Sequence, residues 1–448
     1  MATLTIQIEP QHLIPFNFIY TNNLVINRLG LPLGEPIELS FGSKKAYVYV
    51  RESPVKGNLI RIPSHIANNL LLPNGVKIRA KYHQSTGLKF GPLLGILVQN
   101  VQKNQPQTPF GKFTNFAIEV SEKSRAMGII PYFFTADRIS KNSDFISGWF
   151  YYNNKWEEGT FPIPSVIYNR ISLRKEEEKL LPIIHKLQKQ HPFVFFNNNF
   201  LNKWEVYQLL MQTATRQILP KTVKLQGIAT LREILKRFSI VYLKPTNGAL
   251  GNGIMRLEKT SDGYIVQSNR AQGPVSMNFK SLENLVKYLR PRIAGKTYLV
   301  QEGINLIKID GRPIDFRILV QKNAKGNWDV TSMVARIAND KQFVSNLAQG
   351  GTISPVLETI RTASPELIKK VTRNDFKKYS IEIAKQIDTA ATGLFAELGI
   401  DLALDVNGKI WLLEVNSKPS KTEDPKETNG SRPSVNRLIQ YVHYVSGF

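Results

Sequence analysis

Two acidic residues near the end of the chain have the spacing of a divalent-cation site. Asp401 and Glu414 lie on either side of Asn407-Gly408, a residue pair typical of two-residue β-turns. If those two residues form the turn, Asp401 faces Glu414 across a hairpin, with Cβ atoms about 5 Å apart. Asn416 follows Glu414 on the same face of its strand. Two carboxylates and an amide oxygen suit Mg²⁺, with phosphate oxygens completing its shell.

The alternative interpretation of this hairpin is a polar strand that faces solvent. Apolar residues on both faces of the second strand indicate burial instead and favour the metal site: Trp411, Leu412, Leu413 and Val415. Asp405 is the weaker metal candidate. In the same register it faces Ile410 beside the turn, about 13 Å from Asp401 along the strand at ~3.3 Å per residue.

A glycine-rich loop between two expected strands is a candidate phosphate site. Ile240–Pro245 reads as a strand that carries Lys244 near its end, and Ile254–Glu258 reads as the next strand. The loop between them carries three glycines, Gly248, Gly251 and Gly253. Dinucleotide-binding and P-loop motifs are excluded, because both need a helix after the loop. A loop whose N–H groups and nearby lysine contact phosphates remains, with a flexible hairpin as the alternative.

Acidic and basic residues also share one face of the middle strands. Tyr298–Ile304 is expected to be a strand that runs into a bend. Asp315 and Arg317 share one face of the next strand, and Arg336 ends the strand after that. Carboxylates and guanidinium groups so placed suit ribose hydroxyls and phosphates. An ordinary Asp–Arg surface pair is the alternative, and for these residues alone it is the better supported one.

The composition is that of a globular protein with a basic surface. A chain of 448 residues predicts two or three domains, and 42% hydrophobic and 21% charged residues are ordinary values. The net charge of +24 indicates an anionic partner, which could be a nucleotide, an acidic peptide, another polyanion or a nucleic acid. The absence of cysteine excludes disulfides and thiolate catalysis, and the six histidines show no ligand spacing. With no membrane-length apolar run and no signal peptide, we expect no membrane contact and cytoplasmic synthesis.

The pattern of expected elements divides the chain into three parts. Residues 1–98 are β-rich and carry no catalytic signature. Residues 99–195, with the strand just before them, show the β-α-β rhythm of a small parallel sheet. Residues 196–448 contain the hairpin and the glycine loop.

Three further segments in these parts have readable patterns. Glu176–Gln190 is expected to be a charged helix broken at Pro182. An apolar stripe from Phe376 to Leu398 predicts a core helix that ends at Gly399. Ser417–Pro433 is polar and predicts a mobile loop.

Taken in order, these residues resemble the ATP-grasp superfamily, and most closely its ligases that make D-alanyl-D-alanine or glutamylate a ribosomal protein. Each motif is weak alone, but the ordered set is specific over residues 196 to about 420. The whole chain looks like the spore-coat-associated YheC/YheD-type proteins of Gram-positive spore formers. Phe196–Trp204 and Gly311–Arg317 carry that closer likeness.

The resemblance implies an α/β and α+β multidomain fold. Two α+β subdomains would grip ATP, preceded by a small α/β pre-ATP-grasp domain and the β-rich N-terminal domain. Mg²⁺ would accompany the ATP, with Mn²⁺ as a substitute. The ATP contacts implied are Lys203, Lys244, Gly248, Gly251, Gly253, Gln301, Glu302, Ile304 and Asp315. Lys203 would open a helix capped by Asn202, Glu302 to Ile304 would line adenine largely through backbone, and Asp315 would accept from ribose.

The resemblance also implies catalytic and metal-binding roles. Arg317 and Arg336 would steady the transferring phosphoryl group or an acyl phosphate, and Asn346 would lie in a loop near the phosphates. The metal ligands implied are those of the hairpin, Asp401, Glu414 and Asn416. Ser417-Lys418-Pro419-Ser420 departs from the ligases, which usually have glycine after the proline. Because that loop tends to touch the acceptor, the substrate cannot be carried over.

The reaction implied is ATP-dependent joining of a carboxylate to an amine through an acyl phosphate. An acidic peptide or protein of the spore coat would suit the basic surface, and the chain would then be incorporated into the coat. A structural coat protein that binds ATP without turnover is one alternative, and an ATP-grasp kinase is another. A nucleic-acid partner is favoured by charge alone, because the sequence carries no recognition motif.

Overall fold

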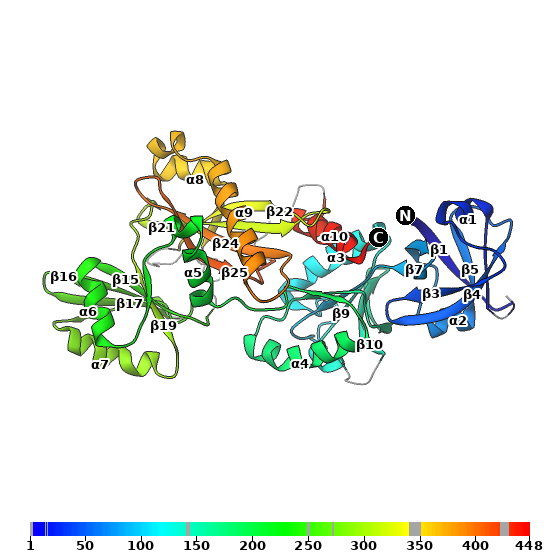
Figure 1. Ribbon diagram of the computed structural model, residues 1–448. Coiled ribbons are helices and arrows are strands. Elements are labelled where there is room, and N and C mark those ends of the chain that lie inside the picture. Colours follow the sequence, from blue (N-terminus) through cyan, green and yellow to red (C-terminus); the bar gives the residue numbers. More distant parts are fainter. Residues whose placement is uncertain are drawn as a thin grey trace.

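The computed structural model arranges the chain as a barrel, a central sheet and a pair of C-terminal sheets (Figure 1). It describes residues 3–13, 15, 17–139, 144–248, 251–270, 273–339, 351–421 and 430–448, without the side chains of 269, 270, 273 and 274. No helix within these ranges is long and apolar enough to cross a bilayer.

The β-rich N-terminal part is a closed barrel. In barrel order its strands are β1 (Thr3–Gln11), β5 (Leu59–Pro63), β2 (Phe18–Thr21), β4 (Lys44–Glu52), β3 (Pro36–Phe41), β7 (Gly87–Gly91) and β6 (Lys77–His83). Helices α1 (Asn23–Leu29) and α2 (Ser64–Asn69) accompany them. The barrel closes where β1 pairs with β6. Alternate apolar side chains such as Ile6, Ile60 and Val48 point inward and form its core.

The central sheet has mostly parallel strands, as the β-α-β rhythm predicted. Its order is β11 (Lys155–Pro162), β10 (Phe145–Tyr152), β9 (Ile130–Phe134), β8 (Leu93–Leu97), β12 (Val166–Asn169) and β13 (Val194–Phe196). Its helices are α3 (Thr114–Ala126) and α4 (Arg174–Gln190). Strand β8 precedes residue 98 and pairs here with β9 and β12. The division at residues 98 and 195 stays a prediction.

Helix α4 is not broken at Pro182, so that prediction is wrong. The helix runs through this residue from Arg174 to Gln190. Pro182 is exposed, whereas Leu180, Ile184 and Leu187 on the opposite side are buried in the core. Their packing outweighs the cost of a proline inside a helix, which is about 3 kcal/mol.

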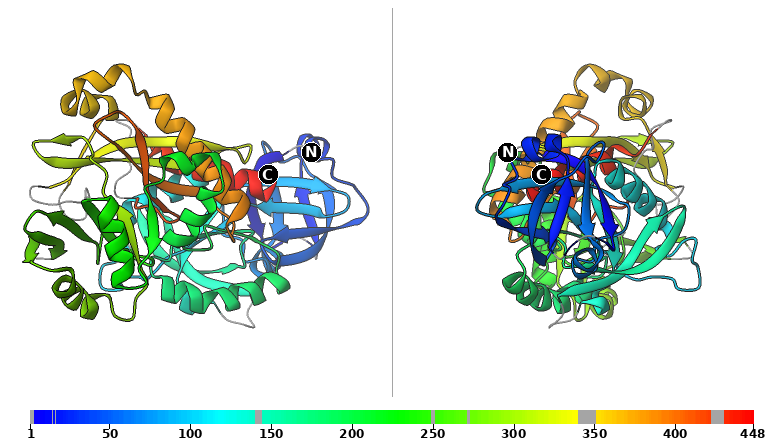
Figure 2. Two further views of the ribbon diagram at one scale, coloured as in Figure 1. Left: turned by 60° about the vertical axis from the view of Figure 1, so that its left-hand side comes forward. Right: turned by 90° about the vertical axis from the view of Figure 1, so that its right-hand side faces the viewer.

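Helix α10 (Pro433–Ser446) returns from the C-terminal part to the central sheet, where it lies beside α3 (Figure 1). Val435, Leu438 and Val442 share a buried core with the central sheet. The segment after α10 reaches the barrel, because Lys81 Nζ lies 4.8 Å from the ring centroid of Phe448. Figure 2 shows this end of the chain beside the barrel strands.

One C-terminal sheet carries the glycine loop. Its order is β14 (Thr222–Lys224), β19 (Tyr298–Glu302), β15 (Ile240–Pro245), β16 (Met255–Thr260), β17 (Gly263–Arg270) and β18 (Gly273–Phe279). Helices α6 (Ile228–Arg237) and α7 (Leu282–Ile293) cover the face that holds Val241 and Leu243. The loop joins two antiparallel strands, as predicted. Side chains alternate along a strand, so Lys244 points to the opposite face.

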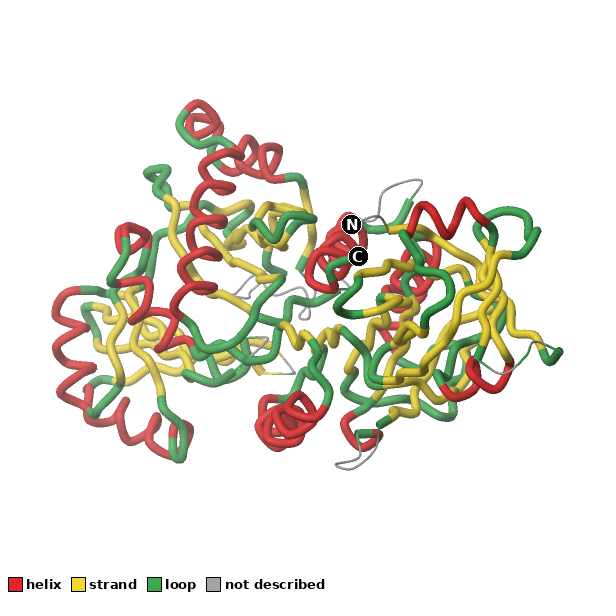
Figure 3. Tube along the Cα trace, turned by 45° about the vertical axis from the view of Figure 1, so that its right-hand side comes forward, coloured by secondary structure: helices red, strands yellow, loops and turns green. Residues whose placement is uncertain are grey.

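The other C-terminal sheet carries the acidic hairpin. Its order is β23 (Thr352–Ser354), β22 (Trp328–Ile337), β21 (Arg312–Lys322), β24 (Glu397–Leu404) and β25 (Ile410–Asn416), and β20 (Lys308–Ile309) pairs with β21. The accompanying helices are α5 (Lys203–Met211), α8 (Val356–Ala363) and α9 (Arg373–Ala390). Figure 3 shows the helices of the C-terminal part in red and its strands in yellow.

The core helix predicted from Phe376 to Leu398 ends earlier than expected. Helix α9 stops at Ala390, and Glu397 already belongs to strand β24. All eight residues of β24 are buried, so its apolar pattern does not distinguish a strand from a helix. Strands β21 and β25 flank it and supply the partners for its backbone.

Candidate functional site

The acidic hairpin pairs Asp401 with Glu414, as predicted, although its turn differs from the prediction. Leu404 already pairs with Ile410, so the connection is longer than two residues. A β-bulge after Asp401 then shifts the register by one residue and brings Glu414 opposite Asp401. The turn and the bulge compensate for each other, which is why the predicted pair survives.

Asp405 organises this turn, and the two-residue turn predicted at Asn407-Gly408, a pair that favours type I′, is wrong. Its Oδ1 accepts hydrogen bonds from the N–H groups of Asn407 and Lys409, both at 2.9 Å. Its Oδ2 accepts from Trp411 Nε1 at 2.9 Å. A type I′ turn needs positive φ at both central residues, but within the turn only Gly408 has one, at 88°. The occupied oxygens leave Asp405 a structural role.

Asp401 is buried and paired with two arginines. Arg317 contacts both of its oxygens, through Nε at 2.5 Å and Nη2 at 3.1 Å. Nη2 of Arg336 lies 3.1 Å from Oδ2. Burial alone would raise the pKa of Asp401, but the two guanidinium groups lower it below its usual value. The carboxylate is therefore ionised, as a metal ligand must be.

Asp315 faces Arg336 across the β21–β22 ladder. Its two oxygens accept from Arg336 Nε at 2.6 Å and Nη2 at 2.7 Å. Both side chains are buried. This bidentate pair holds the guanidinium group of Arg336 where it also reaches Asp401.

Lys203 joins the acidic hairpin to the glycine loop. Its Nζ lies 2.6 Å from Glu414 Oε1 and donates to the Gly248 carbonyl at 2.8 Å. The lysine is the first residue of α5, whose N-cap is Asn202, as predicted. Asn202 Oδ1 accepts from the N–H of Trp204 at 2.9 Å. The helix start thus fixes a cation between the two sheets.

Lys244 lies close to this group from the opposite sheet. Its Nζ donates to Gln301 Oε1 at 2.6 Å, and Gln301 Nε2 donates to Thr222 Oγ1 at 3.0 Å. Burial lowers the pKa of Lys244 to about 8; Glu414 opposes the shift and Lys203 adds to it. Sequence reasoning missed Thr222, because a single threonine on a short strand carries no motif.

A cleft between the two C-terminal sheets contains both lysines. It encloses about 530 Å³ of space, including its solvent-filled mouth. Its polar side carries Lys203, Thr222, Lys244, Gln301 and Glu414. The remaining lining is mostly apolar and was missed from sequence, because it comes from separate segments: Val206, Tyr207, Leu210, Leu219, Pro220, Leu299, Leu412, Leu413 and Val415. A ligand with an apolar ring and an anionic group fits this division.

The remaining predicted residues lie around the cleft or outside the description. The N–H of Glu302 donates to the Lys221 carbonyl at 2.9 Å, and neither Glu302 nor Ile304 lines the cleft. Gly251 and Gly253 have φ values of 72° and 77°, which glycine adopts without strain. Asn346 and residues 249 and 250 lie outside the described residues.

The donor set on the hairpin fits a hard cation. Asn416 Nδ2 lies 3.5 Å from Asp401 Oδ2. The Asn416 amide is therefore next to the Asp401 carboxylate, which faces Glu414 across the hairpin. The described ranges contain no group of three or more acidic, histidine or cysteine side chains arranged to hold a metal. Two carboxylates and an amide oxygen leave coordination positions for phosphate oxygens, as is usual for Mg²⁺.

The segment after Asn416 was expected to be the start of a mobile loop, and for residues 417–421 that prediction is wrong. Ser417, Pro419 and Lys421 are buried. Lys418 forms an ion pair with Glu177, and Lys421 with Glu397. Residues 422–429 lie outside the described ranges, and α10 begins at Pro433.

Two proteins of Bacillus subtilis are similar to this chain in sequence. The chain is 28% identical over 419 residues to "Endospore coat-associated protein YheD" of Bacillus subtilis (strain 168), covering 92% of this chain and 91% of that protein. It is 24% identical over 312 residues to "Endospore coat-associated protein YheC" of the same organism, covering 68% of this chain and 85% of that protein.

Solved structures of ATP-grasp ligases are also similar. ATP-grasp ligase PsnB with a minimal precursor has a TM-score of 0.46 and 13% identity, over 79% of this chain and 99% of that chain. D-alanyl-alanine synthetase A from Vibrio cholerae has a TM-score of 0.45 and 13% identity, over 80% of this chain and 99% of that chain. The description "YheC/D like ATP-grasp" belongs to the family model that matches residues 192–445, more than half of the chain. This chain therefore belongs to the YheC/D-like ATP-grasp family.

Proposed function

We propose that this protein is an ATP-dependent carboxylate–amine ligase that binds MgATP in the cleft between its two C-terminal sheets. The observation that carries the proposal is a convergence of charges at the polar side of that cleft. Four cationic side chains, from α5, β15, β21 and β22, lie around the facing acids Asp401 and Glu414: Lys203, Lys244, Arg317 and Arg336. Triphosphates and divalent metal ions are the ligands that such a mixture attracts.

The cleft divides its lining in the way that a nucleotide requires. Its apolar surface, which includes Leu210, Leu219 and Leu412, would pack against the purine ring. Lys203 and Lys244 would donate to the phosphates, and the glycine loop would cover the phosphates. The adenine contacts assigned to Glu302 to Ile304 and the ATP contact assigned to Gln301 belong to the same proposal; Gln301 lines the cleft, whereas Glu302 and Ile304 lie beyond its lining.

Asp401, Glu414 and Asn416 would hold Mg²⁺, or Mn²⁺ in its place. The ion would neutralise charge on the β- and γ-phosphate oxygens. For this to happen, Lys203 must leave Glu414 and Arg317 must leave Asp401. The phosphates are the natural new partners for both cations, because they offer more negative charge than a single carboxylate.

Arg317 and Arg336 would then stabilise charge on the transferring phosphoryl group. The substrate carboxylate attacks the γ-phosphorus and ADP leaves, giving an acyl phosphate. An amine next attacks the acyl carbon and inorganic phosphate leaves. The protein supplies position and charge and forms no covalent bond, which agrees with a chain that has no cysteine. The role of Asn346 near the phosphates stays a prediction.

The substrate that we propose is an acidic peptide or protein of the spore coat. The net charge of +24 favours an anionic acceptor, and two relatives are named endospore coat-associated proteins. We propose that the protein is made in the cytoplasm and associates with the coat.

The experiment is a screen of carboxylate and amine pairs for ADP release, with Glu414→Gln as the blank. Release that needs both substrates and Glu414, with an amide as product, supports the ligase. A stable phosphorylated product would instead identify a kinase. Nucleotide binding without ADP release for any pair would identify a structural coat protein.

A further inference from the structure

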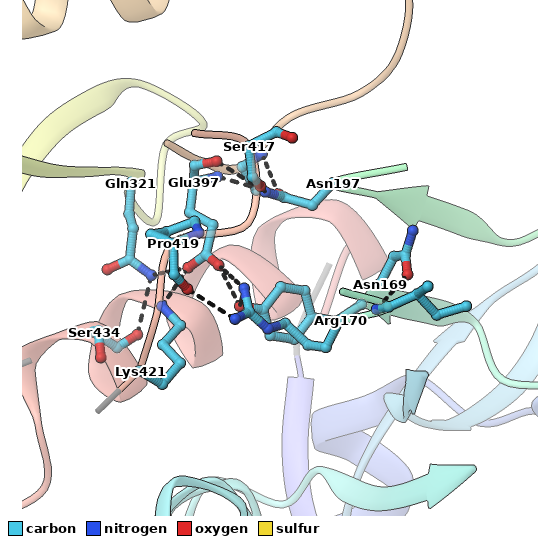
Figure 4. A network of polar contacts seen from close by, with 12 residues as sticks. Asn169, Arg170, Asn197, Gln321, Glu397, Ser417, Pro419, Lys421 and Ser434 are labelled. Carbon is cyan, nitrogen blue, oxygen red and sulfur yellow. Dashed lines mark hydrogen bonds and ion pairs between the residues drawn. The ribbon is translucent and has the colours of Figure 1, made fainter. Parts of the chain in front are cut away.

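The segment Ser417–Lys421, which we call the strap, directly follows Asn416, and Figure 4 shows the polar contacts of its residues Ser417, Pro419 and Lys421. Asn197 Nδ2 donates to the Ser417 carbonyl. Arg170 Nη2 donates to the Pro419 carbonyl at 2.8 Å. Asn197 directly follows β13 and Arg170 directly follows β12. The strap therefore connects the central sheet to the acidic hairpin.

Two buried acids complete the anchoring. Glu177 on α4 pairs with Lys418, and Glu397 at the start of β24 pairs with Lys421 through Oε2 at 2.6 Å. Each of these four side chains is at most 4% exposed. Ion pairs this deep are costly to assemble without close geometry, so they fix position more than they add stability.

Glu397 is the centre of this network (Figure 4). Its Oε1 accepts from Arg170 Nη1 at 2.9 Å and from Tyr168, and its Oε2 accepts from Gln321 Nε2 at 3.2 Å. Burial alone would raise the pKa of Glu397, but Lys421 and Arg170 lower it below its usual value. An ionised carboxylate with this many donors has one low-energy orientation.

The strap lies against the candidate metal site at Gly399. A methyl group on Gly399 would lie 2.9 Å from Pro419 Cβ. The same methyl group would lie 3.7 Å from Arg317 Cδ and 3.7 Å from Asn416 Cβ, which is ordinary contact. Pro419 therefore packs on the strand where the proposed metal ligand and the proposed catalytic arginine come together.

We infer that the strap is a positioning element for the metal site, and that Glu397 is the positioning residue that fixes it. The inference rests on the proposed function, because it concerns the placement of Asn416 and Arg317 for MgATP. Groups behind metal ligands set the orientation of those ligands, and sites with loose support lose affinity.

The test compares two glycine-to-alanine substitutions. In Gly399→Ala the new methyl group is too close to Pro419 but makes only ordinary contact with Arg317 and Asn416, so the strap is the neighbour that must shift. Gly95→Ala is the control, because Gly95 is also buried in a strand and its methyl group would lie 2.8 Å from Phe134 Cε1 and 2.9 Å from Pro164 Cγ, away from the metal site. Neither glycine has a positive φ.

Calorimetry with a non-hydrolysable ATP analogue, with and without Mg²⁺, gives the readout. Mg²⁺ raises the nucleotide affinity of the wild type by some factor, and in Gly399→Ala that factor should be about 10- to 100-fold smaller. Its metal-free affinity, and both affinities of Gly95→Ala, should match the wild type. Glu397→Gln should change binding in the same direction as Gly399→Ala, and if it fails to fold, Gly399→Ala decides alone.

Wild-type affinities for Gly399→Ala, or an equal loss for Gly95→Ala, would overturn the inference and leave the proposed function intact. A wild-type protein whose nucleotide affinity ignores Mg²⁺ would overturn the proposed function together with the inference.

Discussion

Asp401 lies directly opposite Glu414 in the β24–β25 ladder, yet each carboxylate is held by different cations. Asp401 pairs with Arg317 and Arg336, whereas Glu414 pairs with Lys203. The two acids therefore do not repel each other strongly, and a metal ion alone must displace these cations before it can bind. A nucleotide removes the obstacle, because its phosphates attract the same cations.

This arrangement predicts that nucleotide and metal bind together. Wild-type protein should bind Mn²⁺ at this site weakly without nucleotide and strongly with it. Lys203→Met leaves Glu414 without its 2.6 Å partner and should strengthen nucleotide-free Mn²⁺ binding, while weakening nucleotide binding by about tenfold through the loss of one charged hydrogen bond. Electron paramagnetic resonance of Mn²⁺ measures the first effect and calorimetry the second.

Lys224→Met is the control for that variant, because Lys224 is also a lysine near α5 but lies over the Trp204 ring, at 5.2 Å. It should leave both binding reactions unchanged. Strong Mn²⁺ binding to wild-type protein without nucleotide would contradict the account.

The lowered pKa of Lys244 predicts a pH dependence of nucleotide binding. Burial lowers this pKa to about 8 in the free protein, and bound phosphates would raise it again. Affinity should therefore be constant below about pH 8 and fall above it, by up to about tenfold per pH unit. Fluorescence titration with an ATP analogue, repeated at pH values below and above 8, measures the effect. Lys244→Arg stays charged and should remove the pH dependence; a slope that persists in this variant would place its origin elsewhere.

A substitution at Asp315 tests whether this residue contacts ribose or orients Arg336. The family resemblance implies a contact with ribose, but both of its oxygens accept from Arg336 in this structure. If Asp315 orients Arg336, Asp315→Asn should leave the affinity ratio between ATP and its 2′- and 3′-deoxy forms unchanged, and should slow ADP release. If Asp315→Asn binds ATP and the two deoxy forms with equal affinity, Asp315 contacts ribose instead. Competition binding with the three nucleotides gives the answer.

Asp405 should prove structural and not a metal ligand. Asp405→Ala removes the acceptor for two turn N–H groups and for Trp411 Nε1, so it should cost about 1–3 kcal/mol of the free energy of unfolding. Mg²⁺-dependent nucleotide binding by the folded fraction should not change. Chemical denaturation and calorimetry on the same preparation separate the two effects, and a loss of metal dependence would return Asp405 to the metal site.

The sequence predicted those features that depend on neighbours along the chain. The strand pair β15–β16 around the glycine loop follows from local turn and strand residues, and the N-cap of Asn202 follows from two positions. The pair Asp401–Glu414 was predicted by assuming a two-residue turn, and it holds because a bulge compensates for the longer turn. A bulge leaves no mark in the alternation of a strand that is buried on both faces.

Features that depend on distant segments could not be predicted. The barrel closes because β1 pairs with β6 across the N-terminal part, and the cleft is lined from several separate elements. The strap looked like a mobile polar loop, since the partners of Lys418 and Lys421 are Glu177 and Glu397, which lie 241 and 24 residues away along the chain. The charges were visible in the sequence, but their pairing required the tertiary structure.

The most direct test of the central claim is the anomalous signal of Mn²⁺ in a crystal grown with a non-hydrolysable ATP analogue. The account predicts one or more peaks between Asp401, Glu414 and the phosphates, with Lys203 and Arg317 turned from the carboxylates to the nucleotide. A nucleotide bound in the cleft with manganese elsewhere, and with the Arg317–Asp401 and Lys203–Glu414 pairs still in place, would contradict it.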